Sequence, residues 1–230
     1  MWFNYECNYY SSFNYPIAQA NTVTSRLQNQ IESLIFDLFG VIVAFDDGLV
    51  YDRIAQRCPN PTEAALHLFN LVSDPSLICG HKSLQQLHTQ LVAEVELSAS
   101  LEEFEALWIS SYSEPMPGIR ELLRQLARQC KLVLLSNVDP YYWQTVQASI
   151  PELDSFHAKV LSFEQGVAKP NTQAFENAIA ASGVAVGRCY FVDDKSENIE
   201  AAAAIGLAGH AFTSCRALKA KLRQAGLHLQ

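Results

Sequence analysis

The sequence predicts an α/β fold in which a Rossmann-like parallel sheet carries helices on both faces and is joined to a small all-helical domain. Three observations predict it. Several short apolar runs end directly in a polar residue, which is typical of fully buried parallel strands. Beyond residue 117, strand patterns and helix patterns alternate, which implies parallel pairing with right-handed crossovers. Residues 49–112 show helical patterns only, so we expect them to form an insertion after the first strand.

The beginning of the chain differs in composition from the rest. Residues 1–30 contain many aromatic side chains between Trp2 and Tyr15, whereas their only charged residues are Glu6 and Arg26. No basic segment precedes an apolar one, so we do not expect a secretory signal. We expect residues 1–32 to be a poorly ordered N-terminal extension. The alternative is a strap whose aromatic rings lie on the core or on a partner.

The first strand is predicted over residues 33–37, and the sequence Asp-Asp-Gly at 46–48 predicts a turn that leaves the sheet. Helices are then predicted over residues 51–58, 61–72, 83–95 and 100–112. In the third of them, apolar side chains recur at helical spacing and predict a buried face: Leu84, Leu87, Leu91 and Val95. The patterns therefore divide the chain into a helical domain, residues 46–113, and an α/β core, residues 33–45 and 114–230.

The core continues with regular alternation. A helix is predicted over residues 119–129 because its apolar residues fall on one face: Ile119, Leu122, Leu123 and Leu126. The further strands are predicted over residues 131–136, 158–162, 188–193 and 209–212. Between and after them, helices are predicted over residues 139–150, 172–182, 197–205 and 217–225. Pro140 is compatible with the first of these helices because it stands in its first turn.

The composition narrows the functional classes. Apolar residues make up 49% of the 230 residues and charged residues 17%, which supports a large buried core. The formal net charge is -8 and no basic cluster appears, so we expect neither nucleic acid nor membrane as a partner. The six cysteines form no C-x-x-C pair and no metal spacing with histidine, which favours reduced thiols in a cytoplasmic protein. The sequence leaves the oligomeric state open.

Polar groups gather at the predicted strand ends. Asp37 ends the first strand, Ser136 the second, and Asp193 with Asp194 the fourth, while Lys169 lies in a loop between the last two positions. The carboxyl ends of parallel strands meet at the edge of the sheet where ligands bind. Carboxylates, a hydroxyl and an ammonium at one edge predict a site for phosphate and a divalent metal.

Each of these groups suits such a site. Asp37 can attack phosphorus once a cation reduces the repulsion between two anions. Gly40 permits a tight backbone that brings amides near a phosphate. Lys169 supplies positive charge, and Asp193 with Asp194 offers hard oxygen ligands for Mg²⁺. Each residue alone has an ordinary alternative as a turn or helix cap, so the prediction depends on their joint order.

Four motifs stand in that order: Phe36-Asp37-Leu38-Phe39-Gly40-Val41, Leu135-Ser136-Asn137, Gly166-Val167-Ala168-Lys169-Pro170 and Phe191-Val192-Asp193-Asp194. The chain thereby resembles the haloacid dehalogenase-like (HAD-like) hydrolase superfamily over about residues 33–213. Within it, the helical segment after the first motif resembles the branch of the glucose-1-phosphatase-like and epoxide hydrolase amino-domain-like proteins.

The resemblance implies a phosphatase that acts through an aspartyl-phosphate. Asp37 would be its nucleophile and Lys169 a second catalytic residue. The transferring group would be bound by Ser136, Asn137 and Gly40. Mg²⁺ would be held by Asp37, Asp193, Asp194 and the main-chain carbonyl of Phe39. The helical domain would act as a cap that selects a small phosphorylated metabolite, with a sugar phosphate as one candidate.

One position departs from the family pattern. Most phosphatases of this superfamily carry a second aspartate two residues after the nucleophile, as the general acid and base, and this chain has Phe39 there. General acid catalysis contributes about 10²–10⁴-fold, so we expect poor leaving groups to react slowly. Asp46 or Asp47 could substitute, although a turn role is the ordinary reading of that pair.

Two alternatives stay open. An aromatic residue at this position also suits a metal-independent 2-haloacid dehalogenase, which would need an arginine near the start of the cap, and Arg53 is the only early candidate. The other alternative is a non-catalytic binding or regulatory protein that keeps the fold, because Phe39 replaces the usual acid and base.

Overall fold

The computed structural model describes residues 31–111 and 114–230, so the aromatic segment at the start of the chain lies outside the described residues. The sheet has five parallel strands in the order β3-β2-β1-β4-β5. The strands are β1 (Ser33–Phe36), β2 (Lys131–Ser136), β3 (Ala158–Leu161), β4 (Cys189–Asp193) and β5 (Ala208–Ala211). The predicted α/β fold with a parallel sheet is confirmed.

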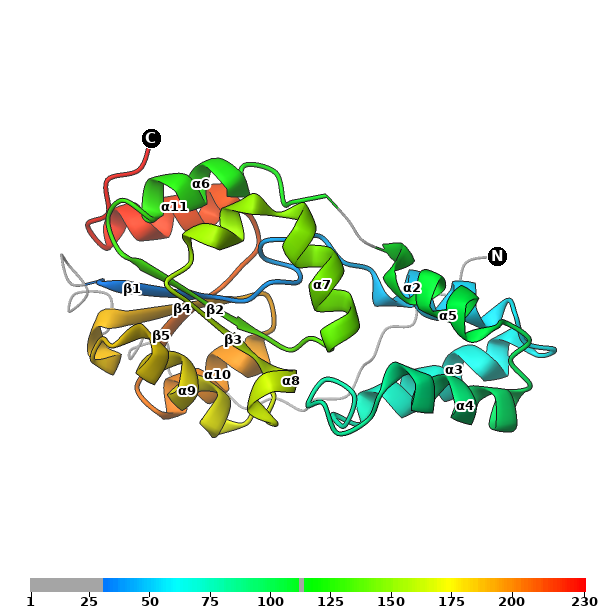
Figure 1. Ribbon diagram of the computed structural model, residues 1–230. Coiled ribbons are helices and arrows are strands. Elements are labelled where there is room, and N and C mark those ends of the chain that lie inside the picture. The colour runs from blue at the N-terminus through cyan, green and yellow to red at the C-terminus, as the bar shows by residue number, and fades with distance from the viewer. Residues whose placement is uncertain (1–30, 112–113) are drawn as a thin grey trace, which may run out of the picture.

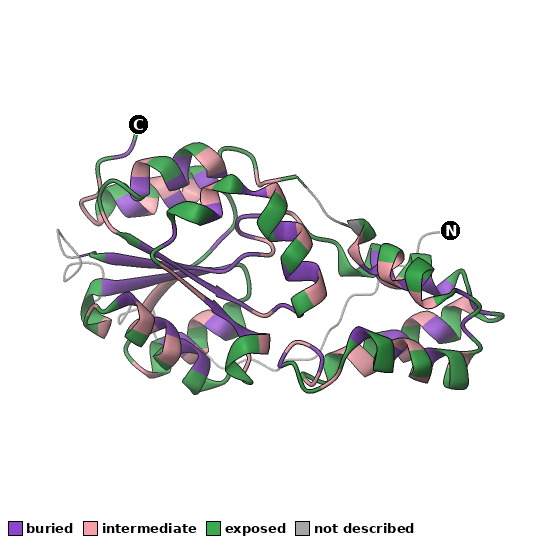
Figure 2. Cartoon of the chain, in the orientation of Figure 1, coloured by how far each residue is buried: buried purple, intermediate pink, exposed green. Residues whose placement is uncertain are grey.

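Helices cover both faces of the sheet (Figure 1). One face carries α6 (Ile119–Leu126), α7 (Pro140–Ser149) and α11 (Cys215–Gln224), and the other carries α9 (Thr172–Ser182) and α10 (Ser196–Ala204). Side chains of β1 alternate between the two layers, because Leu34 and Phe36 pack on one side and Ile35 packs on the other. Figure 2 shows the three central strands, β1, β2 and β4, buried along almost their whole length, which is why their sequences are almost uninterrupted apolar runs.

Four further helices form a group beside one end of the sheet (Figure 1). They are α2 (Asp47–Ala55), α3 (Pro61–Ser73), α4 (Leu84–Val95) and α5 (Leu101–Trp108). We call them the helical group. Ser83 and Ser100 start α4 and α5 with capping boxes, in which each serine accepts a backbone N–H and the third helical residue returns a side chain. The predicted buried face of α4 is present, because Leu84, Leu87 and Leu91 are all buried.

The prediction of a turn over residues 46–48 is wrong. Asp46 is instead the N-cap of α2, and its Oδ1 atom accepts a hydrogen bond of 3.1 Å from the backbone N–H of Leu49. An Asp-Asp-Gly sequence suits a turn and a capped helix start equally well. Here the helix is favoured because Val50 and Ile54 form the buried face of α2.

The helix predicted over residues 100–112 is present as α5 followed by the 3₁₀ helix η2 (Ile109–Ser111). Three short elements were not predicted: α8 (Ser162–Gln165), η3 (Pro151–Ser155) and η4 (Val186–Arg188). Segments of three to five residues are shorter than the window in which a helical period can be recognised.

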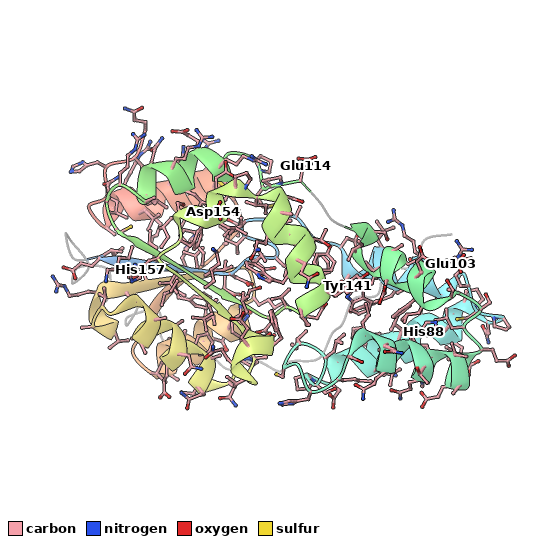
Figure 3. All side chains as sticks on the ribbon, viewed as in Figure 1. His88, Glu103, Glu114, Tyr141, Asp154 and His157 are labelled. Carbon is pink, nitrogen blue, oxygen red and sulfur yellow. The ribbon has the colours of Figure 1, made fainter. Side chains whose placement is uncertain are left out.

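The helical group is tied to the core by the connecting segments and by hydrogen bonds from side chains. The two connecting segments run side by side, since Met116 N–H donates to the Ile42 carbonyl at 2.8 Å. At the C-terminal end of α5, the Trp108 indole Nε1–H donates to Asp139 Oδ2 at 3.1 Å. Tyr141, labelled on α7 in Figure 3, donates a hydrogen bond from its hydroxyl to Glu105 Oε2 of α5 at 2.9 Å.

Among the described helices, none is both long enough and apolar enough to cross a membrane.

Candidate active site

Three aspartates converge where the central strands end. Asp37 follows β1, while Asp193 is the last residue of β4 and Asp194 follows it. One carboxylate oxygen from each lies within 4.8 Å of the others. Parallel pairing of β1 with β4 explains the convergence, because Phe36 lies opposite Val192 in the register and the next residues leave the sheet together. The structure therefore brings together the acidic residues singled out from the sequence.

Lys169 lies between two of these aspartates. Its Nζ atom is 2.8 Å from Asp37 Oδ1 and 2.7 Å from Asp193 Oδ2. All three side chains are almost completely buried, so solvent screens these interactions little. The usual reading of a loop lysine as a solvent-exposed side chain does not apply here.

The charges shift the acidities of the cluster. Burial raises the pKa of Asp37 to about 7, against the opposing effect of the Lys169 ammonium. Burial also acts to raise the pKa of Asp193, but Lys169 and a hydrogen bond from Asn198 hold it below its ordinary value. The pKa of Asp194 is raised by burial and by the negative charge of Asp193. For Lys169, burial is outweighed by Asp37 and Asp193, which raise its pKa and keep it charged.

This donor set fits a magnesium ion. Asp37 and Asp193 are buried with one ammonium, Lys169, while the exposed Asp194 lies near Lys195, so three carboxylates meet two ammonium groups and leave excess negative charge. A divalent cation would neutralise that excess, and Mg²⁺ prefers carboxylate oxygens together with water and phosphate oxygens. The participation of the Phe39 main-chain carbonyl stays a prediction.

Two asparagines position the charged groups. Asn198 donates from Nδ2 to both carboxylate oxygens of Asp193 at 3.0 Å, which fixes the orientation of that carboxylate. Asn137 forms a two-way clamp on the lysine backbone, because its Nδ2 donates to the Lys169 carbonyl and its Oδ1 accepts the Lys169 N–H, each at 2.8 Å. The sequence proposed Asn137 as a substrate ligand and did not predict this clamp, which joins loops that are 32 residues apart.

Ser136 is placed differently from the other predicted residues. It ends β2, is fully buried and is not among the residues that line the cavities described below. Its hydroxyl makes no hydrogen bond to any described residue. Since no described residue pairs with this hydroxyl, it is free to accept another partner. Its role with a phosphoryl oxygen stays a prediction.

Gly40 brings the loop after β1 close to Asp194. Its φ angle is 78°, and a Cβ atom added there would lie 2.4 Å from Asp194 Oδ2. We expected this glycine to bring amides near phosphate, and the structure adds a steric reason for a glycine at this position. Only glycine permits both the left-handed backbone and the close approach of the carboxylate.

Replacing Gly40 by alanine should therefore displace Asp194. We expect Gly40→Ala to weaken Mg²⁺ binding and lower turnover by about 10- to 100-fold, the range usual for residues that orient metal ligands. Isothermal titration with Mg²⁺ measures the first effect. Gly187→Ala is the matched control, because no other group lies within 4 Å of its added Cβ atom. Equal Mg²⁺ affinity in both variants would contradict this role.

Phe39 is part of an aromatic cluster. Its ring centroid lies 4.8 Å from that of Phe45 and 5.4 Å from that of Tyr142, and the latter two rings are 5.3 Å apart. Where the usual acid would stand, this chain thus has an apolar wall. Phe45 and Tyr142 were not predicted as a cluster with Phe39, because they come from separate segments.

Two adjoining cavities open at these residues. The polar chamber, of about 360 Å³, is lined by Asp37, Gly40, Lys169, Asp194 and Asn198, among others. The apolar chamber, of about 130 Å³, is lined mostly by apolar side chains from both the core and the helical group. Of the pair with an expected turn role, Asp46 caps α2, whereas Asp47 lines both chambers.

Arg53, the arginine that a dehalogenase would need, lies outside both chambers, and so does His88. Arg53 donates from Nη1 to the carbonyl and the hydroxyl of Ser110 at 2.8 and 2.9 Å, and it lines neither chamber. His88 lies within the helical group (Figure 3), where its Nε2 atom is hydrogen-bonded to the Ala99 carbonyl at 2.9 Å. Neither side chain is among the residues that line the two chambers.

Comparison with known proteins gives a consistent picture. The family model of the haloacid dehalogenase-like hydrolases matches residues 31–206. A sesquiterpene phosphatase, astK of Aspergillus oryzae, is 30% identical over 111 residues, which is 48% of this chain and 57% of that protein. The chain thus spans little more than half the length of that relative.

Solved structures share the fold at low identity. A HAD family enzyme of Bacteroides thetaiotaomicron, in a variant crystallised with magnesium and inorganic phosphate, aligns with a TM-score of 0.70 at 20% identity, over 80% of this chain and 95% of that one. The L-2-haloacid dehalogenase of Xanthobacter autotrophicus aligns with a TM-score of 0.58 at 20% identity, over 86% and 84%.

Proposed function

The chain belongs to the haloacid dehalogenase-like hydrolases, and from that premise we propose that it is a Mg²⁺-dependent phosphatase of a small phosphorylated metabolite. The observation that carries the proposal is the convergence of three aspartates, two of them paired with the buried Lys169, beside a cavity that Asp37, Lys169 and Asp194 line. The similarity to a sesquiterpene phosphatase supports the same reaction class.

In the proposed mechanism, Asp37 is the nucleophile. One of its carboxylate oxygens attacks phosphorus, and the bond between phosphorus and the ester oxygen breaks with its electron pair leaving on that oxygen. Water then attacks the aspartyl-phosphate and releases inorganic phosphate, which restores the carboxylate. Lys169 would hold the equatorial oxygens of the phosphoryl group as charge develops on them. Ser136 and the Gly40 loop would complete the binding of these oxygens.

The metal would be held by Asp37, Asp193 and Asp194, with the Phe39 carbonyl as a further ligand. Bound Mg²⁺ would supply the charge that lets an anionic nucleophile approach an anionic phosphate. Asn198 keeps the Asp193 carboxylate oriented for this role, and Asn137 keeps Lys169 in reach of the substrate oxygens.

We also propose that the helical group, with its flanking loops over residues 46–113, acts as a cap on a core of residues 33–45 and 114–230. Its residues Val72 and Ile78 line the polar chamber together with Asp37 and Lys169. The paired connecting segments would serve as the hinge, and the bond from Trp108 to Asp139 would hold the closed position.

The experiment that tests the function measures phosphate release from acetyl phosphate by the full-length chain. We expect turnover with Mg²⁺ and a loss of at least about 100-fold after removal of the metal with EDTA, because the metal contributes several kcal/mol to the transition state. Activity that is unchanged by EDTA would contradict the proposal. Binding of Mg²⁺ and phosphate without any turnover would favour the non-catalytic alternative.

The aromatic residue at position 39 predicts a strong dependence on the leaving group. No carboxyl is available at this position to protonate the departing oxygen, so we expect acyl and aryl phosphates to react about 10²–10⁴-fold faster than alkyl phosphates. Phe39→Asp should reduce this difference in rate between good and poor leaving groups, and Asp47→Asn should leave the difference unchanged. Rates for all three substrate classes, measured with saturating Mg²⁺, provide the test. If the unmodified chain hydrolysed all three classes at similar rates, another group would have to donate the proton.

The dehalogenase alternative has weaker support. The solved dehalogenase shares the fold, but Arg53, its candidate for gripping a halide, is bonded to Ser110 and lies outside both chambers. Chloride release from a 2-chloro acid in EDTA would favour this alternative. If no chloride is released, the phosphatase proposal stands.

A further inference from the structure

We propose that the substrate is a phosphate ester whose organic group is apolar, which rests on the proposed function and names its substrate class. The phosphoryl group would occupy the polar chamber and the organic group the apolar chamber. Among the candidates raised by the sequence, a sugar phosphate is thereby disfavoured.

The two chambers adjoin and share part of their walls. Phe39, Phe45, Val72, Ile78, Asp47 and Asn137 line both of them. A ligand with its phosphate beside Asp37 and Lys169 would therefore extend directly past the Phe39 ring into the apolar chamber. This ring stands at the junction, where it forms the aromatic cluster with Phe45 and Tyr142.

The apolar chamber offers carbon surface on most sides. The core contributes Val138 and Tyr142, and the helical group and its loops contribute Val50, Leu77 and Trp108, all of them buried. Phe45, at 37% exposure, is one of few large apolar side chains that reach solvent among the described residues. An apolar ligand would cover it and remove that surface from water.

Two polar side chains of this chamber are already engaged. Asp139 accepts the backbone N–H groups of Tyr141 and Tyr142, both at 2.9 Å, and the indole N–H of Trp108. Asn137 is used in its clamp on the Lys169 backbone.

No lysine, arginine or histidine is among the residues that line the apolar chamber. The other polar side-chain groups of the lining residues are the Asp47 carboxylate and the hydroxyl groups of Tyr51 and Tyr142. A sugar would bring several hydroxyl groups here, and hydroxyl groups that lose water without gaining partners weaken binding. An aliphatic or aromatic group meets the same walls without that loss.

The proposal can be tested by binding, without turnover. The full-length chain with Mg²⁺ is titrated by calorimetry with methyl-, butyl-, hexyl- and octylphosphonate, below their micelle concentrations. We expect affinity to rise by up to about fourfold for each added methylene until the chamber is filled. The phosphonate analogue of glucose 6-phosphate should bind no more tightly than methylphosphonate.

Two substitutions in α3 test whether the dependence of affinity on chain length arises in the apolar chamber. Val72→Asn places an amide in the shared wall and should flatten the chain-length dependence, whereas Leu66→Asn, at a side chain 63% exposed on the same helix and outside the lining, should keep it. Ile78→Asn replaces Val72→Asn if that variant does not fold.

The outcomes separate the two proposals. An affinity independent of chain length, a preference for the sugar analogue, or an unchanged dependence in Val72→Asn would each overturn the apolar substrate class, even if the chain releases phosphate from acetyl phosphate. A chain-length dependence that is lost in Val72→Asn supports the substrate class. If the chain shows this dependence but releases phosphate from no ester, the proposed function is wrong and the binding preference is not.

Discussion

Replacing Asp37 by asparagine should abolish turnover while leaving the protein folded. We expect a loss of at least about 10⁴-fold in kcat, because asparagine cannot form the covalent phosphoryl intermediate and the other groups act together with the nucleophile. Phosphate release from acetyl phosphate at saturating Mg²⁺ measures it. Asparagine nearly matches aspartate in shape, so the Lys169 side chain keeps its contact with Asp193.

The same variant should not lose stability. Burial raises the pKa of Asp37 from 3.8 to about 7, so between these values the folded protein keeps a proton that the unfolded chain has released. Ionising Asp37 above pH 7 therefore opposes folding, and asparagine removes that cost. In EDTA at pH 8 we expect the thermal midpoint of Asp37→Asn to equal or exceed that of the unmodified chain, with the difference narrowing toward pH 4.

Two results would contradict this account. Turnover reduced by less than about tenfold would mean that Asp37 is not the nucleophile. A thermal midpoint several degrees lower in the variant would mean that the loss of activity reflects unfolding, and that the Asp37 carboxylate stabilises the fold through Lys169 more than burial opposes it.

The acidic site could be predicted because its information is local. Asp37 and Asp193 each follow an apolar run, and a parallel sheet must bring the carboxyl ends of neighbouring strands together. The same reasoning placed the five strands and most helices within a few residues of their observed bounds. It was wrong at Asp46, where a turn signal and a helix cap use the same residue type.

What the sequence could not predict depends on contacts between distant segments. The clamp from Asn137 to Lys169 requires the β2 loop and the loop before α9 to meet, and no spacing in the chain specifies their separation. The aromatic cluster similarly joins Phe39 and Phe45 to Tyr142, about a hundred residues later. The apolar chamber is formed by these long-range contacts, which is why the sequence left the substrate open.

Replacing Lys169 by methionine should have the largest effect on stability. Methionine has a similar length but no charge, so Asp37 and Asp193 would lose the ammonium that lies 2.8 and 2.7 Å from them. Removing one partner from a buried ion pair typically costs about 3–5 kcal/mol, because the remaining charge stays buried without compensation. We expect that loss in the free energy of unfolding, measured with urea in EDTA at pH 8. Turnover should also fall by at least about 100-fold, since the positive charge on the phosphoryl oxygens is gone.

Magnesium distinguishes this electrostatic loss from a simple packing defect. A ligand that binds only the folded state stabilises it, and a cluster without its ammonium leaves more negative charge for the cation to neutralise. Added Mg²⁺ should therefore restore more unfolding free energy to Lys169→Met than it adds to the unmodified chain. Lys159→Met, on β3 and without an ion pair among the described residues, is the control and should change neither quantity. If Mg²⁺ stabilised both proteins equally, the lysine and the metal would not share the same carboxylates, and the assignment of Asp37 and Asp193 as metal ligands would be lost.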